Sequence, residues 1–211
     1  MNIYIGLDQR QPIAAQVLMH SIYMRASKPV RLTPLVLSRL PIKRRGLTDF
    51  TFSRYLVPFL DDYVGRSIFM DADMLCLGDV YELVELADTM AAVSVVKNKQ
   101  RFEWPSLMVF NNAMCRRLSP DWIDNKDTAP QSLSWAKDIG ELPPDWNHLV
   151  GYDRKTPDAK LVHFTSGIPC WPETKDCEYA AEWQAERKAC NSTVSWEELM
   201  GRSIHREKVL G

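Results

Sequence analysis

Residues 66–73 read Arg-Ser-Ile-Phe-Met-Asp-Ala-Asp, an apolar strand that ends in two carboxylates. An extended chain puts residues i and i+2 on the same side, so Asp71 and Asp73 are expected to face one point. Ligands bind at the carboxyl ends of strands in open α/β sheets. Two close carboxylates repel each other unless a cation lies between them, and their oxygens suit Mg²⁺ or Mn²⁺. The stretch predicts a metal site; a solvated strand end or a helix N-cap is the alternative.

Strands and helices alternate on both sides of this stretch. Strands are predicted at 2–7, 31–37, 66–70, 90–96, 106–110 and 160–164, and helices at 13–25, 79–86 (with Asp79 as N-cap), 178–189 and 195–204. The alternation is typical of an α/β fold with a mixed, mostly parallel sheet and C-terminal helices. We expect a single domain over 1–211, with a ligand-binding half at 1–110, a second half at 111–171 and a helical tail at 172–211.

Composition excludes several classes of protein. The chain has 211 residues, 45% of them hydrophobic, which is enough for one domain with a sizeable core. Its formal net charge of −1 argues against a nucleic-acid binder, because such proteins carry a basic surplus. Its five cysteines form no CxxC pair, and no apolar run approaches the ~20 residues that span a bilayer. The N-terminus enters a strand directly, so we expect a cytoplasmic protein without a signal peptide or transmembrane segment.

Four blocks of the sequence share their order and spacing with one known family. They read Ile-Tyr-Ile-Gly-Leu-Asp at 3–8, Phe-Ser-Arg-Tyr-Leu-Val-Pro at 52–58, Ile-Phe-Met-Asp-Ala-Asp at 68–73 and Leu-Val-His-Phe-Thr-Ser-Gly at 161–167, the last closing on Trp171. In these blocks the chain resembles glycosyltransferase family eight and its bacterial or phage relatives. The resemblance implies the GT-A fold, a Rossmann-like domain that binds nucleotide sugars.

The resemblance also implies a function and a metal. It predicts metal-dependent transfer of a sugar from a nucleotide-sugar donor, most simply a UDP-sugar, to a glycan or lipid-linked acceptor, with retention at the anomeric carbon. The implied metal ligands are Asp71, Asp73 and His163. Imidazole beside two carboxylates favours Mn²⁺ over Mg²⁺. Without the resemblance, a lone histidine such as His163 is a core or surface residue.

The implied donor-binding set draws on all four blocks and on the end of the strand at 106–110. It comprises Gly6, Leu7, Asp8, Arg54, Asp71, Ala72, Asp73, Asn111, Asn112 and Gly167. Several of these have a second interpretation. Arg54 either holds Asp71 or the donor ribose, or is a surface cation whose stem packs on the protein. Asp8 either accepts from the uracil or ribose, or caps a turn. Asn111 and Asn112 either bind sugar hydroxyls or cap a helix.

The acceptor side is assigned to the segment 135–147, which is expected to cross or approach the sheet's carboxyl edge. Asp138 lies in the part of the chain where many family members carry an Asp-Gln pair, so it joins Asp73 as a candidate catalytic residue. Trp146 and Asn147 are the candidate acceptor contacts, because a sugar can stack on an aromatic ring. Core packing is the alternative for Trp146.

Other features keep further functions open. The family carries a phosphate-contacting lysine before its Pro-Trp, whereas this chain has Pro169-Cys170-Trp171, so an inactive nucleotide-sugar-binding relative is one alternative. A nucleotidyltransferase or metal-dependent phosphohydrolase also uses strand-end carboxylates. Gly167 permits close approach to a phosphate or is a turn glycine. The basic run at 43–45 is a solvated loop or a weak membrane-surface contact.

Overall fold

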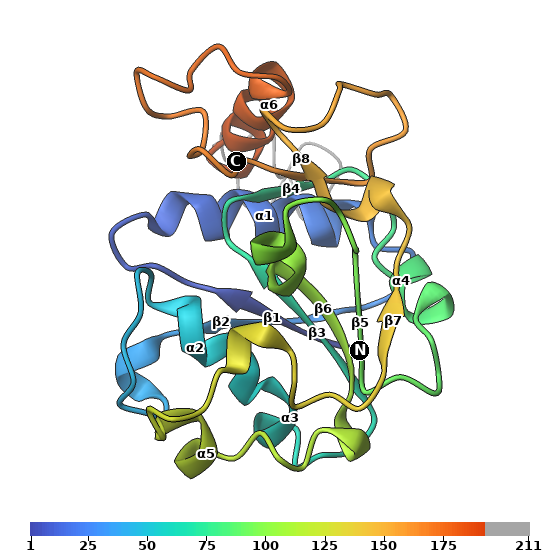
Figure 1. Ribbon diagram of the computed structural model, residues 1–211. Helices are drawn as coiled ribbons and strands as arrows, with labels where there is room; N and C mark the ends of the chain where they lie inside the picture. The colour runs from blue at the N-terminus through green and yellow to red at the C-terminus, as the bar shows by residue number, and fades with distance from the viewer. Residues whose placement is uncertain (193–211) are drawn as a thin grey trace, which may run out of the picture.

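The computed structural model describes residues 1–192, and at its centre is a six-stranded sheet in the order β2-β1-β3-β6-β5-β7 (Figure 1). The strands are β1 (Asn2–Gly6), β2 (Arg31–Leu35), β3 (Arg66–Asp71), β4 (Met74–Cys76), β5 (Val93–Val95), β6 (Leu107–Asn111), β7 (Ile139–Glu141), β8 (His148–Leu149) and β9 (Leu161–His163). The α-helices are α1 (Pro12–Arg25), α2 (Phe50–Ser53), α3 (Val57–Leu60), α4 (Glu82–Leu86), α5 (Pro120–Asp124) and α6 (Ala180–Cys190). The 3₁₀ turns are η1 (Leu37–Arg39), η2 (Arg54–Leu56), η3 (Arg101–Ser106), η4 (Asn112–Met114), η5 (Pro130–Ser132) and η6 (Pro144–Asn147).

The central sheet is covered on both faces, which explains why its strands are continuously apolar. Ile68 and Met70 of β3 belong to the core beneath α1, whereas Phe69 belongs to the core on the other face. β1 and β6 alternate in the same way. Figure 1 shows α1 and α6 on one side of the sheet and α2, α3 and α5 on the other. The predicted α/β class is confirmed: β1 pairs in parallel with β2 and β3, and β5 with β7, while β6 is antiparallel to both of its neighbours.

A second, three-stranded sheet in the order β4-β9-β8 lies beside α1. Only two residues, Ala72 and Asp73, separate the end of β3 from the start of this sheet's first strand, β4, so the turn that they form joins the two sheets. β9 pairs antiparallel with β4, and His163 is opposite Met74 in that pairing. The sequence predicted β9 but not β4, β7 or β8, each of which has three residues or fewer. Such short strands carry almost no periodic signal.

Several predicted boundaries need correction. The helix predicted from Asp79 begins at Glu82 instead, and the Asp79 carboxylate accepts a hydrogen bond from the Tyr81 amide in the preceding turn. The strand predicted at 90–96 is shortened to β5. The helix predicted at 195–204 lies outside the described residues. Within the described residues, no helix is long and apolar enough to cross a membrane.

Candidate active site

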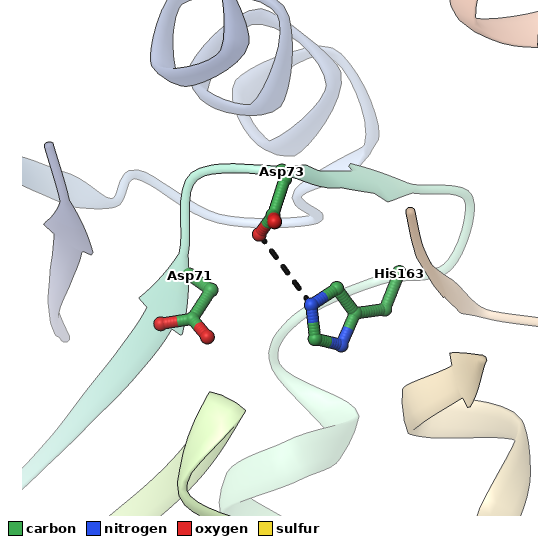
Figure 2. Close-up of side chains that lie close together, drawn as sticks. All are labelled: Asp71, Asp73 and His163. Atoms are coloured by element: carbon green, nitrogen blue, oxygen red, sulfur yellow. Dashed lines mark ion pairs between the residues drawn. The ribbon is translucent and has the colours of Figure 1, made fainter. Parts of the chain in front are cut away.

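Three candidate metal ligands converge at the carboxyl end of β3 (Figure 2). Asp71 is the last residue of that strand and lies opposite Gly6 of β1, while Asp73 follows in the turn. His163 comes from β9, and its Nε2 lies 3.4 Å from Oδ1 of Asp73. One ligand atom from each of the three side chains falls within 4.8 Å of the others. Residues far apart in sequence therefore present two carboxylates and an imidazole to one point.

Strand pairing brings His163 to this point. β9 is antiparallel to β4, which itself starts directly after Asp73. The Phe164 amide donates a 2.9 Å hydrogen bond to the Asp73 carbonyl, which extends the pairing by one step. The backbone pairing of β9 with β4 and the hydrogen bond from Phe164 to Asp73 therefore fix the position of His163.

Arg54 holds the buried Asp71 carboxylate from the other side. Its Nη2 lies 3.0 Å from Oδ1 of Asp71. Its other nitrogens donate to backbone carbonyls, Nε to Phe50 at 3.1 Å and Nη1 to Pro105 at 2.9 Å. The side chain is buried, so the surface-cation interpretation of Arg54 is wrong. Arg54 lies in η2, which contacts α3, and α3 in turn contacts β3.

The site's electrostatics favour a bound cation. Burial raises the pKa of Asp71; Arg54 opposes this rise, and the Asp73 carboxylate adds to it. Burial alone would lower the pKa of His163, but the Asp73, Glu103 and Asp71 carboxylates raise it overall. Among the described residues, the buried Oδ1 of Asp73 accepts no hydrogen bond, and Oδ1 of Asp71 has only its ion pair with Arg54. A divalent cation would satisfy these oxygens and relieve the repulsion between the carboxylates.

Asn147 completes the support of His163. Its Oδ1 lies 3.2 Å from His163 Nδ1, and its Nδ2 donates to the Glu103 carbonyl at 3.3 Å. An amide oxygen can only accept, so the arrangement puts a proton on Nδ1 and directs Nε2 toward Asp73. Metal-binding histidines are commonly oriented in this way. Two carboxylates and an oriented imidazole are a ligand set that suits a divalent cation such as Mn²⁺.

We expect the thermal stability of the metal-free protein to fall as pH rises from about 4 through about 7, where buried Asp71 has its native pKa. Asp71 and His163 both have native pKa values above their unfolded values. Their contribution to stability is present below the unfolded pKa values and is lost as pH rises through the native ones. A divalent cation such as Mn²⁺ would bind the deprotonated ligands, so its stabilising effect should instead grow with pH. Unfolding midpoints measured across this range in chelator and in Mn²⁺ test both trends.

Asp71→Asn is the matched control, since it removes the main titrating carboxylate at nearly constant volume. Its midpoint in chelator should depend less on pH than that of the wild type. Equal pH dependence in the two proteins would rule out Asp71 as the source of the trend.

A pocket of about 560 Å³ opens beside the three ligands. Its walls come from the loop before α2, from α2 and η2, and from η3. Glu103 of η3 lines it and was missed by the sequence analysis. The Glu103 carboxylate accepts a 2.8 Å hydrogen bond from the Ser106 hydroxyl and lies 3.8 Å from His163 Nδ1. No sequence signal marks Glu103, because only the antiparallel direction of β6 brings the segment before that strand to the site.

The placement predicted for Asn111, Asn112 and Asp138 is wrong. Because β6 runs antiparallel to β3, Asn111 lies opposite Arg66, at the end of the sheet away from Asp71. Asn112 is buried there and donates to the Val64 carbonyl and the Ser67 hydroxyl. Asp138 is exposed at the same end, where its carbonyl accepts from the Ala92 amide. None of the three lines the pocket.

The acceptor-side prediction is wrong for Trp146. Its side chain is fully buried in the core beneath α1, which is the packing alternative. Asn147 is buried too and supports His163 instead of lining the large pocket. Gly167 has a φ of +115°, so a turn requires it, and it packs against Trp171.

The first-strand residues lie near the ligands, and their role in donor binding stays a prediction. Asp8 and Ala72 line a smaller cavity of about 80 Å³ together with Asp73. Asp8 is engaged by Arg10, whose Nε donates to Oδ1 at 2.9 Å, and this bond holds the pKa of Asp8 below its usual range. Leu7 is half-buried against the core. A Cβ at Gly6 would lie 2.7 Å from the Phe50 side chain, so packing alone demands glycine there.

The fold is that of GT-A-type glycosyltransferases. The chain is similar to the WbbM bifunctional glycosyltransferase (TM-score 0.66, 14% identity), covering 96% of this chain and about half, 51%, of that one. It is also similar to the galactosyltransferase LgtC in complex with donor and acceptor sugar analogues (TM-score 0.60, 10% identity), covering 94% of this chain and 99% of that one. The glycosyltransferase GlyE of Streptococcus pneumoniae TIGR4 gives a TM-score of 0.60 at 15% identity, with 98% and 64% covered.

In sequence, the chain belongs to the same family as Protein CDI of Arabidopsis thaliana. The two are 34% identical over 227 aligned residues, which cover 90% of this chain and 87% of the relative. No protein-family model matches the chain.

Proposed function

We propose that this protein transfers a sugar from a nucleotide-sugar donor, a UDP-sugar, to a glycan or lipid-linked acceptor in the cytoplasm. One observation carries the proposal: Asp71, Asp73 and His163 converge beside a large pocket at the carboxyl end of β3. This is the edge at which α/β sheets bind ligands. The GT-A fold supports the same conclusion.

Each residue of the site has a role in the proposal. Asp71, Asp73 and His163 would hold Mn²⁺, and the bound cation would supply positive charge to offset the charge of the departing nucleoside diphosphate. Arg54 keeps the Asp71 carboxylate oriented and compensates part of its charge. Asn147 keeps Nε2 of His163 directed toward the metal position.

Arg45 could replace the phosphate-contacting lysine that this chain lacks in its last block. It is exposed and lines the large pocket, so its guanidinium is available to a donor phosphate. Arginine binds phosphate through a planar fork of donors. In the proposal, Arg45 supplies the cationic phosphate contact from the loop before α2, with Gly6, Leu7, Asp8 and Gly167 as further donor contacts.

The stereochemical part of the proposal is retention at the anomeric carbon, which the family resemblance supports. Glu103 is a pocket carboxylate beside His163, so it is available to stabilise positive charge on the sugar. The anomeric configuration of the product, read by proton NMR immediately after transfer, distinguishes retention from inversion.

Incubation with a panel of nucleotide sugars and Mn²⁺ tests the proposal. We expect free UDP to appear with a UDP-sugar and not in chelator. Release of pyrophosphate would indicate a nucleotidyltransferase, and release of inorganic phosphate a phosphohydrolase. Binding of UDP-sugars without turnover in the presence of cell-derived acceptors would indicate an inactive relative and would contradict the proposed transfer.

A further inference from the structure

Two exposed aromatic side chains meet at the rim of the large pocket. Phe102 is 67% exposed and Tyr152 is 53% exposed, although their ring centroids lie 6.4 Å apart with an interplanar angle of 72°. The two residues are 50 positions apart and come from η3 and from the turn after β8. A contiguous exposed apolar surface next to a ligand pocket is typical of a binding site.

The two aromatic residues lie where the large pocket and a second pocket adjoin. Phe102 lines the pocket that contains Asp73 and His163. Tyr152 lines a neighbouring pocket of about 540 Å³. Asn147 lies between them, since it lines the second pocket while bonding to His163 and to the Glu103 carbonyl of the first. A ligand on the aromatic pair would therefore extend from the proposed transfer site into the second pocket.

Both rings stand on segments with fixed backbones. Next to Phe102, the Trp104 indole donates a 2.9 Å hydrogen bond to the Asn98 carbonyl. Next to Tyr152, the Asp153 carboxylate accepts a 2.8 Å hydrogen bond from the Leu149 amide and closes the turn. Such preorganisation lowers the entropic cost of binding.

The lining of the second pocket specifies the chemistry of the occupant. It combines the apolar residues Val96, Pro144 and Tyr152 with polar ones, and its charges balance: the basic residues are Lys97, Lys99 and Arg154, and the acidic ones are Asp145, Asp153 and Asp158. A lipid chain there would bury charged side chains of both signs at a high cost, and a strongly anionic ligand would find no net positive charge. A sugar ring has an apolar C–H face and a rim of hydroxyls, which suits an aromatic ring beside mixed polar groups.

We propose that Phe102 and Tyr152 form the platform on which a neutral oligosaccharide acceptor stacks, with the rest of the oligosaccharide in the second pocket. The proposal rests on the proposed glycosyl transfer for the identity of the ligand as an acceptor. It replaces Trp146 as the acceptor-side aromatic and selects a glycan over the lipid moiety of a lipid-linked acceptor.

An array of neutral and acidic oligosaccharides, probed with the full chain in Mn²⁺ and UDP, tests the platform. The strongest array oligosaccharide is then measured in solution by saturation-transfer NMR. We expect Tyr152→Ala and Phe102→Ala each to weaken its binding by roughly tenfold, the scale of an aromatic anchor. Tyr152→Phe keeps the ring and should retain most of the affinity. Tyr23→Ala is the matched control, because Tyr23 is 53% exposed and lies on α1.

The outcomes separate the platform from the proposed function. Weaker oligosaccharide binding in Tyr152→Ala, with UDP affinity retained, supports the platform. Unchanged oligosaccharide binding in both alanine variants, a loss equal to that in Tyr23→Ala, or no oligosaccharide bound by a wild type that binds UDP would overturn it. Oligosaccharide binding that depends on Tyr152 in a protein without UDP affinity would uphold the platform and reject the proposed transfer.

Discussion

Asp73→Asn is expected to abolish turnover and to reduce Mn²⁺-dependent UDP affinity by roughly a hundredfold or more, beyond the loss typical of residues that only support metal ligands. The substitution removes one negative charge from the cluster at nearly constant volume. The Asp73 side chain is 29% exposed, and its one ion-pair partner among the described residues is His163. The unfolding free energy should therefore change by less than about 1 kcal/mol. Calorimetry of UDP with and without Mn²⁺, together with urea unfolding, measures the two effects.

Two further variants sharpen this test. His163→Ala should weaken Mn²⁺ binding by roughly tenfold or more, because it removes the third ligand of the cluster. Asp138→Asn is the matched control: the residue is another aspartate beside a strand end, but it lies at the opposite end of the sheet. UDP affinity that is the same in chelator and in Mn²⁺ would refute the metal site. An equal loss in Asp138→Asn would show that the effect is not specific to the cluster.

Trp146→Ala is expected to lower the unfolding free energy by about 3–5 kcal/mol, a large part of the stability of a single domain. The side chain is fully buried in the core, and η6, which carries it, packs on β9, so its removal leaves a cavity that the surrounding elements cannot fill. Urea unfolding monitored by circular dichroism measures the loss.

Trp171→Ala is the control for this second prediction, because Trp171 is 45% exposed. Its stability loss should be several-fold smaller. The contrary result would be a Trp146→Ala protein that keeps near wild-type stability and has only a raised acceptor KM. That result would show that Trp146 contacts the acceptor. Such a result would also weaken the assignment of that site to Phe102 and Tyr152.

The sequence by itself determined the class of fold and the core of the site. The apolar runs at 2–7 and 66–70 predict strands, and the apolar spacing at 13–25 predicts a helix. The structure has these elements at Asn2–Gly6, Arg66–Asp71 and Pro12–Arg25. The pair Asp71 and Asp73 could be found because two residues at i and i+2 share one side of a strand, a local property of the chain. His163 could be predicted as a metal ligand only because the whole block at 161–167 resembles a family motif. A single histidine has no spacing from which a metal site can be inferred.

The tertiary structure alone decided which strand ends meet. Nothing in the residues at 107–111 says that this strand runs antiparallel to β3, because a strand buried on both faces looks the same in either direction. That one reversal moves Asn111 and Asn112 away from the site and brings Glu103 to it.

The same limit applies to contacts between distant segments. Packing of distant segments buries Trp146 in the core, places Asn147 within hydrogen-bonding distance of His163, and brings the Phe102 ring against the Tyr152 ring. Local propensity fixes what each segment becomes, whereas pairing direction and packing fix which side chains can touch a common ligand.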